Sequence, residues 1–448
     1  MTPYDAEVRI VRHNAGKSPG PDGGIAGVPL PNQFCFLVSR SDGSIIEPAF
    51  DFMCRTYLTS GPETKLKGSE NTIAARVSDL ADFHHFLDAQ KTKVAKLETD
   101  TLKKYAHDLS TSKSAATGEQ LSGSTMARRW SSVTKFVLHC QQKGYLKNSI
   151  PTGTRTTRKG DVDYLVIDHD LPAAANSDRQ ITALHPETLQ GVLNELGSPV
   201  IEVVDLRVQL CRPSTTDRLM AEVAANAGLR RTEVCNLRIT TIRTHPRTEL
   251  DPISKLSITV LGKGKKKRSV PFPIWLLDAL ERYAYGLRAA AVAMRQQLTG
   301  EPDHGYLFVH ATGNKRYIGN RITPQVLDRH FAMARQRYLD ELSKREEQIH
   351  YQLASAEIIT PHALRHTFAI TTFVVRQQGG DAYPTKYVSG VLGHADTDTT
   401  ERIYLRSVEA FESKIRERIR QIQEQRPHMR LGDRAVAEYL GPPETQRQ

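Results

Sequence analysis

The fold of this chain is decided by TPHALRHTFAI, residues Thr360–Ile370. Its proline, Pro361, suits the first turn of a helix, where the missing backbone N–H is not needed. In such a helix, His362 and Arg365 are three residues apart and point from the same face. The stretch therefore predicts a helix that presents an imidazole and a guanidinium group together.

A second stretch, LGHADTDTTERIYLR at Leu392–Arg406, follows closely. It contains His394 and, ten residues later, Tyr404. A tyrosine is more often a packed or surface residue, and the chain has 15 of them. Two imidazoles, a guanidinium group and a phenol within one C-terminal block nevertheless suit nucleophilic chemistry on a phosphodiester.

The histidines His362 and His366 are also four residues apart, a spacing that zinc-binding helices use. Position 363 is alanine, where a zinc protease helix needs its general-base glutamate. We therefore expect no metal site here, and we expect His366, which faces the same way as His362, to be a packed residue or one that supports the site indirectly.

Composition places the chain among globular proteins of two or three domains. It has 448 residues, of which 39% are hydrophobic and 25% charged, and no apolar run reaches the length of a membrane span. The N-terminus lacks the apolar core of a secretory signal, and five cysteines lie far apart without a CxxC pair. This cysteine usage fits reduced thiols in a cytoplasm. A net charge of +11 favours a polyanionic partner, although surplus lysine also occurs on ordinary solvated surfaces.

Hydrophobic spacing divides the chain into regions. From Asn71, apolar residues recur every three or four positions, and two more helical patterns follow before residue 148. The stretch 148–180 is rich in proline, glycine and basic residues, which is typical of a linker. Beyond it, helical patterns flank two β-rich runs around GKGKKKR at Gly262–Arg268. Near the N-terminus, two short β-like runs around Ser-Asp-Gly indicate a hairpin.

Two internal pieces carry cations that are ambiguous when taken singly. Arg230 lies in GLRRTEV, where an arginine is often half of a surface ion pair, and Glu233 is an available partner. Lys263 lies on the glycine-flanked turn of GKGKKKR, for which a solvated hairpin tip is the simpler explanation. The glycines would also allow a close approach to a sugar-phosphate backbone, where a lysine could protonate a leaving oxygen.

Taken together, the four pieces are more specific than any one of them. In chain order they are GLRRTEV, LGKGKKKRSVPF, TPHALRHTF and LGHADTDTTERIY, and this order of functional groups resembles the tyrosine recombinase (phage integrase) family. The resemblance covers roughly residues 180–410, and the segment 70–147 is similar to the family's core-binding domain. The resemblance implies six active-site residues: Arg230, Lys263, His362, Arg365, His394 and Tyr404.

The resemblance also implies a fold that is mainly α-helical, with a small β-sheet in the catalytic domain. A helical SAM-like core-binding domain and an α/β integrase catalytic domain would form a C-shaped clamp of two domains around duplex DNA. The expected segments are an N-terminal extension with a candidate β-hairpin (1–68), the core-binding domain (69–150), a basic linker (151–180), the catalytic domain (181–410), and a C-terminal helix and tail that docks on a neighbouring protomer (411–448).

By the same resemblance, Tyr404 would attack a DNA phosphate, form a 3′-phosphotyrosyl ester and free a 5′-hydroxyl. Two arginines would hold the non-bridging oxygens, and Lys263 would protonate the leaving 5′-oxygen. His362 would assist proton transfer at the tyrosine, and His394 would hydrogen-bond the phosphoryl group. Because the ester conserves the bond energy, we expect neither a metal ion, nor ATP, nor another cofactor.

The implied partner is double-stranded DNA at specific recombination sites. A homo-tetramer on two sites would exchange strands through a Holliday junction, with or without accessory proteins. The enzyme would work in a bacterial cytoplasm, on the nucleoid, for DNA integration or transposition of a mobile genetic element, without a membrane partner. The basic residues expected to contact DNA are Arg128, Arg129, Lys135, Lys265, Lys266, Lys267 and Arg268.

Three alternatives use the same residues differently. A type IB topoisomerase would form the same ester but religate the same strand, and a telomere resolvase would convert one substrate into hairpin ends. A DNA-binding architectural protein with a decayed site would form no covalent adduct. The presence of all six residue types argues against that last alternative.

Overall fold

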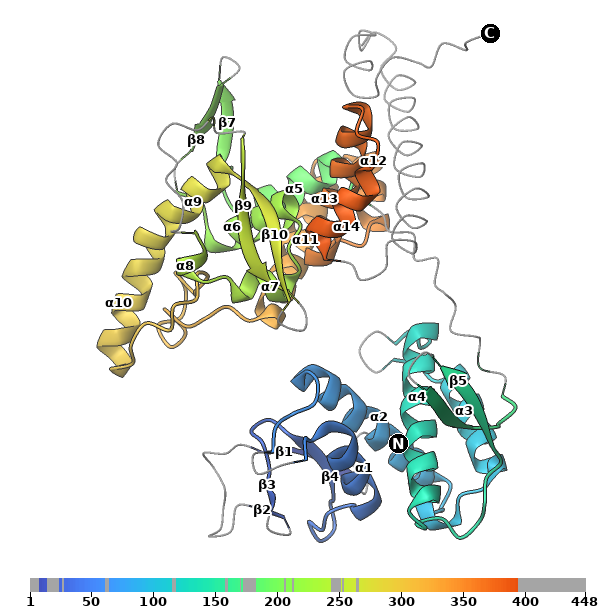
Figure 1. Cartoon of the computed structure of the whole chain (residues 1–448). Coiled ribbons are helices and arrows are strands. Elements are labelled where there is room, and N and C mark those ends of the chain that lie inside the picture. The colour runs from blue at the N-terminus through green and yellow to red at the C-terminus, as the bar shows by residue number, and fades with distance from the viewer. Residues whose placement is uncertain are drawn as a thin grey trace, which may run out of the picture. The chain divides into compact units, whose positions relative to one another are not determined.

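Two units, Met1–Arg179 and Gln180–Gln448, divide the chain, and each has its own hydrophobic core. The expected fold class is confirmed, because the protein is mainly helical with small antiparallel sheets. The computed structural model (Figure 1) describes residues 8–13, 24–25, 28–60, 64–114, 118–157, 160–169, 171, 183–204, 207–211, 213–242, 251, 254–262 and 266–393. No helix among these residues is long and apolar enough to cross a membrane.

The first unit is a helical domain with short strands at both ends of its sequence. Helix α2 begins after Ser69, whose side chain accepts a hydrogen bond from the backbone N–H of Thr72, and Ser122 caps α4 in the same way. The largest core side chains include Phe83, Tyr105 and Phe136. The elements are β1 (Val8–Arg12), β2 (Gly24–Ile25), β3 (Val28–Pro29), β4 (Cys35–Ser39), α1 (Glu47–Tyr57), α2 (Glu70–Ala89), the 3-10 helix η1 (Val94–Lys96), α3 (Thr99–Thr111), α4 (Gly123–Gln142), β5 (Thr152–Thr157) and β6 (Gly160–Leu165).

The hairpin expected around Ser-Asp-Gly is present in a short form, with an antiparallel bridge between Val38 and Ile45 and a hydrogen bond from the Ser39 N–H to the Ser44 carbonyl. Strand β4, which precedes this turn, also pairs antiparallel with β1, with Ile10 opposite Leu37. After the turn the chain forms helix α1 from Glu47, with a proline in its first turn. Within the region expected to be a linker, β5 and β6 pair as an antiparallel hairpin.

The second unit combines a helical core with a β-hairpin. Strands β9 and β10 pair antiparallel, with Val270 opposite Ile258, which confirms the small sheet expected around GKGKKKR. Figure 1 shows this hairpin beside α6 and α7. The elements are α5 (Pro186–Leu196), β7 (Ile201–Val204), β8 (Arg207–Leu210), α6 (Thr216–Ala227), α7 (Arg231–Asn236), α8 (Ile239–Ile242), β9 (Lys255–Leu261), β10 (Lys267–Pro273), α9 (Ile274–Tyr285), α10 (Leu287–Thr299), α11 (Pro324–Lys344), α12 (Gln348–Ala356), α13 (Pro361–Gln378) and α14 (Pro384–Leu392).

Helix α13 lies in the core of the second unit, and local sequence signals define its start. The Thr360 side chain accepts a hydrogen bond from the N–H of Ala363, and Pro361 occupies the first turn. Its apolar side buries Leu364, Phe368 and Ile370. The predicted helix at TPHALRHTFAI is therefore confirmed, and it brings Arg365 into the interior of the unit.

Candidate active site

Arg365 is almost completely buried and joins the ends of two other helices. Its side chain is 2% exposed. One terminal nitrogen donates to the carbonyl of Gly228 and the other to the carbonyl of Leu392, each at 2.6 Å. Gly228 is the left-handed C-cap of α6, and Leu392 is the last residue of α14. The Arg365 guanidinium thus binds helix-terminal carbonyls that would otherwise lack intrahelical partners.

Arg230 lies immediately before α7 and is held by Glu233. The backbone N–H of Arg230 donates to Glu233 Oε2 at 2.8 Å, and its side-chain Nη1 donates to Oε1 at 2.9 Å. The carboxylate also lies 3.8 Å from Arg365 Nη1. The structure therefore brings the two predicted phosphate-binding arginines to the same buried carboxylate.

A third arginine, Arg268, reaches the same carboxylate from strand β10. Its terminal nitrogens donate to both oxygens of Glu233, at 2.8 and 2.7 Å. Burial alone would raise the pKa of Glu233, but the hydrogen bonds from Arg268 and from the backbone of Arg230 outweigh it and lower the pKa below its ordinary value. Glu233 is therefore an anion at neutral pH, surrounded by guanidinium groups.

His362 lies one turn before Arg365 on α13 and is exposed. Its ring packs edge-on against His366, with ring centroids 4.3 Å apart, as expected for a packed neighbour. Desolvation, followed by repulsion from Arg365 and Arg230, lowers the pKa of His362. The ring is therefore neutral at physiological pH and able to accept a proton.

Arg230 and His362 line one open cleft between α7, α11 and the start of α13. The cleft encloses about 1010 Å³ including its mouth, and Arg231, Thr360 and Phe331 also line it. Arg231 pairs with Asp328 across the cleft wall. A cation and a neutral imidazole in one solvent-accessible cleft form a suitable environment for a phosphodiester.

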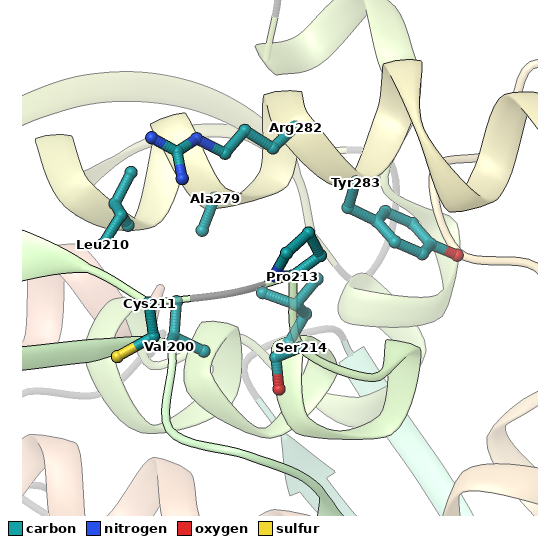
Figure 2. A pocket seen from close by; sticks show the side chains of 9 residues that line it. Val200, Leu210, Cys211, Pro213, Ser214, Ala279, Arg282 and Tyr283 are labelled. Atoms are coloured by element: carbon teal, nitrogen blue, oxygen red, sulfur yellow. The ribbon is translucent and has the colours of Figure 1, made fainter.

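A second cavity in the same unit has a different character (Figure 2). It spans about 290 Å³ when the open solvent at its mouth is included, and its walls are mostly apolar, with Val200, Leu210, Leu219 and Ala279 among them. In the view of Figure 2 the Arg282 and Tyr283 side chains come from helix α9. Arg230, His362 and Arg365, the predicted active-site residues that the structure describes, do not line this cavity.

Three of the predicted active-site residues, Lys263, His394 and Tyr404, lie outside the described residues. The same holds for Lys265, one of the predicted DNA contacts. Their roles stay predictions. Lys266 and Lys267 are described and exposed.

The predicted DNA contacts of the first unit differ in how their charge is balanced. Arg128 is ion-paired with the buried carboxylate of Asp79, and Arg129 with Asp82 at 2.6 Å. Lys135 is exposed, and desolvation and repulsion from Arg76 and Arg155 lower its pKa. No carboxylate within the described residues lies at ion-pair distance from Lys135. Arg128 and Arg129 are therefore cations paired with carboxylates, whereas Lys135 is a cation that lies near other cations.

From the sequence, Glu233 was only an available ion-pair partner of Arg230, and Arg268 was expected to contact DNA. Strand alternation could have shown where Arg268 points, because it has the same parity in β10 as the buried Val270 and Phe272. The position of Glu233, three residues after Arg230, suits a helix N-terminus and could have predicted its bond to Arg230. Its contacts with Arg268 and Arg365, on two other segments, could not be predicted from the local sequence.

Comparisons with known proteins show what the whole chain is similar to. A model of the phage integrase family matches residues 202–410, and a model of the phage integrase N-terminal SAM-like domain matches residues 65–141. The tyrosine recombinase XerC of Myxococcus xanthus is 25% identical over 343 residues, which cover 76% of this chain and 88% of that protein. The tyrosine recombinase XerD of Brucella suis is 25% identical over 333 residues, 74% of this chain and 86% of that protein. Among solved structures, the XerH site-specific recombinase bound to a palindromic difH substrate is 18% identical, covering 78% of this chain and 80% of that one, with a TM-score of 0.47.

Proposed function

This chain belongs to the phage integrase family of tyrosine recombinases, and from that premise we propose that it cuts and rejoins duplex DNA at specific sites through a covalent tyrosine–phosphate ester. The observation that carries the proposal is the convergence of Arg230 and Arg365 on Glu233, beside a cleft that also contains His362. Guanidinium groups bind phosphate oxygens bidentately and stabilise the charge that builds on them in the transition state.

In the first step, the phenolic oxygen of Tyr404 attacks the phosphorus atom as its proton passes toward His362. A bond forms between the tyrosine oxygen and phosphorus, and the bond from phosphorus to the 5′-oxygen breaks. Lys263 supplies the proton that the leaving 5′-oxygen needs, and His394 hydrogen-bonds the phosphoryl group. The products are a 3′-phosphotyrosyl ester and a free 5′-hydroxyl.

In the second step, a 5′-hydroxyl from the other duplex attacks the ester, and the tyrosine oxygen leaves and regains its proton. One phosphate ester replaces another in each step, so the reaction needs no external energy source. The lowered pKa of His362 supports its part in both directions, since a neutral imidazole can take a proton and later return it.

The affinity for duplex DNA would come mainly from cations without a carboxylate partner. Burial lowers the pKa of Lys135, and the charges of Arg76 and Arg155 lower it further, so Lys135 lies near two other cations. Lys266 and Lys267 are exposed at the β9–β10 hairpin of the second unit. We assign these groups to phosphate binding together with Lys265. Arg128 and Arg129 would add less, because Asp79 and Asp82 already balance their charge.

Strand exchange between two duplexes requires four cleavages, so the working assembly in this proposal is a homo-tetramer on two sites that passes through a Holliday junction. The C-terminal segment 411–448 is the candidate for docking on a neighbouring protomer. Recombination between two marked sites would separate this activity from that of a topoisomerase, which religates the same strand. Hairpin products on a denaturing gel would instead indicate a telomere resolvase.

The decisive experiment traps the ester. Sites are first selected by binding from a random-sequence DNA pool and then built as nicked duplexes, from which the short 5′-hydroxyl fragment escapes after cleavage. We expect a covalent protein–DNA adduct with the wild-type chain and none with Tyr404→Phe. Arg365→Ala should slow adduct formation by about 10²–10³-fold, as for the loss of a transition-state donor.

The matched control is Tyr387→Phe, because Tyr387 packs under the Arg376 guanidinium, 3.7 Å from the ring centre, through its ring and not its hydroxyl. This variant should form the adduct at the wild-type rate. An adduct that persists in Tyr404→Phe would show that another residue is the nucleophile. A wild-type chain that binds its selected sites but never forms an adduct would be an architectural DNA-binding protein.

A further inference from the structure

The Arg268 guanidinium connects three segments of the second unit. It comes from the second residue of β10, donates to both Glu233 oxygens of α7, and donates from Nε to the Val391 carbonyl of α14 at 2.8 Å. The Arg268 side chain is 9% exposed and that of Glu233 is 4% exposed. A fork-to-fork pair of this kind fixes both the distance and the plane of the two groups.

The orientation of Glu233 decides where Arg230 lies. The same two oxygens that accept from Arg268 also accept from the backbone and the side chain of Arg230. A carboxylate rotated away from Arg268 would lose this geometry, because both of its oxygens are shared. Arg268 therefore acts on Arg230 through Glu233.

The end of α14 is held from two sides. Arg268 binds the Val391 carbonyl, and Arg365 binds the carbonyl of the next residue, Leu392. Both carbonyls belong to the negative end of the helix, where guanidinium groups are favourable. Gly393 then turns the chain in the left-handed region, and a Cβ there would lie 2.9 Å from Arg268 Cδ.

A second glycine encloses the guanidinium from the hairpin side. A Cβ on Gly262 would lie 2.9 Å from Arg268 Nη1 and 3.4 Å from Glu233 Oε1. The φ angle of Gly262 is not in the left-handed region, so its lack of a side chain is needed for the close approach and not for the backbone conformation. Arg268 is thus enclosed on both sides by backbone that carries no side chain.

We propose that Arg268 is a positioning residue of the active site, which fixes Glu233 and the end of α14 so that Arg230 and Arg365 bind one phosphate together, and that it does not contact DNA. This inference rests on the proposed function. It replaces the expectation that Arg268 is one of the DNA-binding cations. Lys267, its exposed neighbour of opposite parity in β10, keeps that role.

The test compares cleavage with binding in Arg268→Lys, which keeps the charge but cannot form the two-pronged pair. Single-turnover adduct formation at saturating DNA should fall by about 10²-fold, the size expected when a reacting group is misplaced by about 1 Å. The DNA dissociation constant and its salt dependence should not change. Lys267→Ala should behave in the opposite way, lowering the slope of log K against log salt by about 0.9.

Two further measurements separate positioning from a general loss of structure. Arg268 lowers the pKa of Glu233, so its replacement should move the acidic limb of the cleavage rate profile to higher pH, at pH values where circular dichroism shows that the variant is still folded. Gly262→Ala changes no charge but should displace the guanidinium, and it should lower the cleavage rate without changing DNA affinity. If Arg268→Lys shows no cooperative unfolding transition and is therefore not folded, Gly262→Ala is the variant that tests the proposal. Arg345→Ala, which removes only an exposed pair with Glu341, is the control expected to change neither quantity.

Wild-type cleavage rates at saturating DNA in folded Arg268→Lys and Gly262→Ala would overturn the proposal. A salt slope lowered by about 1 in Arg268→Lys, with cleavage intact, would do so as well, because it would identify Arg268 as a phosphate contact. A wild-type chain without any covalent adduct would instead contradict the proposed function itself.

Discussion

Glu233 is a single buried carboxylate that faces three guanidinium groups, those of Arg230, Arg268 and Arg365. Glu233→Gln would keep the size of the side chain but leave these cations without their counter-ion in a buried site. We expect the free energy of unfolding of the second unit to fall by about 3–5 kcal/mol, the usual cost of removing one partner of a buried ion pair. Urea denaturation followed by circular dichroism measures this change.

The matched control for that substitution is Glu341→Gln. Glu341 pairs with Arg345 along α11, and both side chains are exposed. Its loss should change the free energy of unfolding by less than about 0.5 kcal/mol, as for other exposed helix pairs. Equal effects of the two substitutions would mean that Glu233 does not organise the arginines in solution.

His84 makes the first unit sensitive to acid. Burial, together with repulsion from His85, lowers the pKa of His84 from 6.5 to about 4. Since the unfolded chain takes up this proton near pH 6.5 and the folded chain does not, stability is full above pH 6.5 and falls as the pH drops toward 4. The loss should amount to about 3 kcal/mol at pH 4, by linkage.

Thermal unfolding of the wild-type chain and of His84→Leu across this pH range measures the contribution of His84. The variant should lose less stability on acidification, and the exposed His107→Gln should follow the wild-type curve. Parallel curves for wild type and His84→Leu would show that His84 is protonated in the folded state.

Single residues were predictable from sequence where their role is local. His362 and Arg365 lie on one helix as their spacing predicted, and His366 packs against His362. The partner of Arg128 was not predictable, because Asp79 lies on another helix, and helical spacing identifies a face but not what covers it. The same limit applied to the pairing of Arg268 with Glu233.

The N-terminal cap of α13 affects the active site as well as stability, because His362 lies in the first turn of this helix. The Thr360 side chain accepts from the Ala363 N–H at 3.3 Å. Thr360→Ala should cost about 1 kcal/mol of stability and loosen this turn. We expect faster amide exchange at residues 363 and 364 and a several-fold slower formation of the covalent adduct at saturating DNA.

Ser69→Ala removes the corresponding cap of α2 in the first unit and is the matched control. It should cost a similar free energy of unfolding without slowing the cleavage step. If both substitutions slowed cleavage equally, the rate would reflect overall stability and not the position of the first turn of α13.

For the helices and strands, some sequence signals were sufficient to predict the element and others were not. Apolar spacing predicted the helices, and glycine with lysine between β-rich runs predicted the β9–β10 hairpin. The N-terminal hairpin signal predicted the bridge between Val38 and Ile45, but it did not predict the second pairing of β4, with β1 across more than twenty residues of sequence. Pairing between distant strands depends on the core that both strands cover, and a short alternating pattern does not encode it.

For the chain as a whole, the order of four separated pieces was more informative than any composition value. Arginine, lysine, His-x-x-Arg, and histidine with tyrosine occur in an order that a fold must bring together, and the family comparison supports that reading. The net charge of +11 indicated a polyanionic partner but did not indicate which cations would bind that partner. The structure separates cations already paired with carboxylates from those that are not.

The difference between cations that are paired with carboxylates and those that are not predicts how DNA affinity depends on salt concentration. Each cation that neutralises a DNA phosphate releases condensed counter-ions and contributes about 0.9 to the slope of log K against log salt. Lys135→Ala should therefore lower the slope by about 0.9, since no described carboxylate balances Lys135. Arg128→Ala should leave the slope nearly unchanged and instead destabilise the first unit by about 2 kcal/mol, because Asp79 loses a buried hydrogen-bond partner. Binding titrations at four or more salt concentrations, together with unfolding curves of each variant, measure both quantities. A slope lowered equally by both substitutions would show that Arg128 exchanges Asp79 for a phosphate when DNA binds, and that ion pairs in the free protein do not identify the DNA-binding cations.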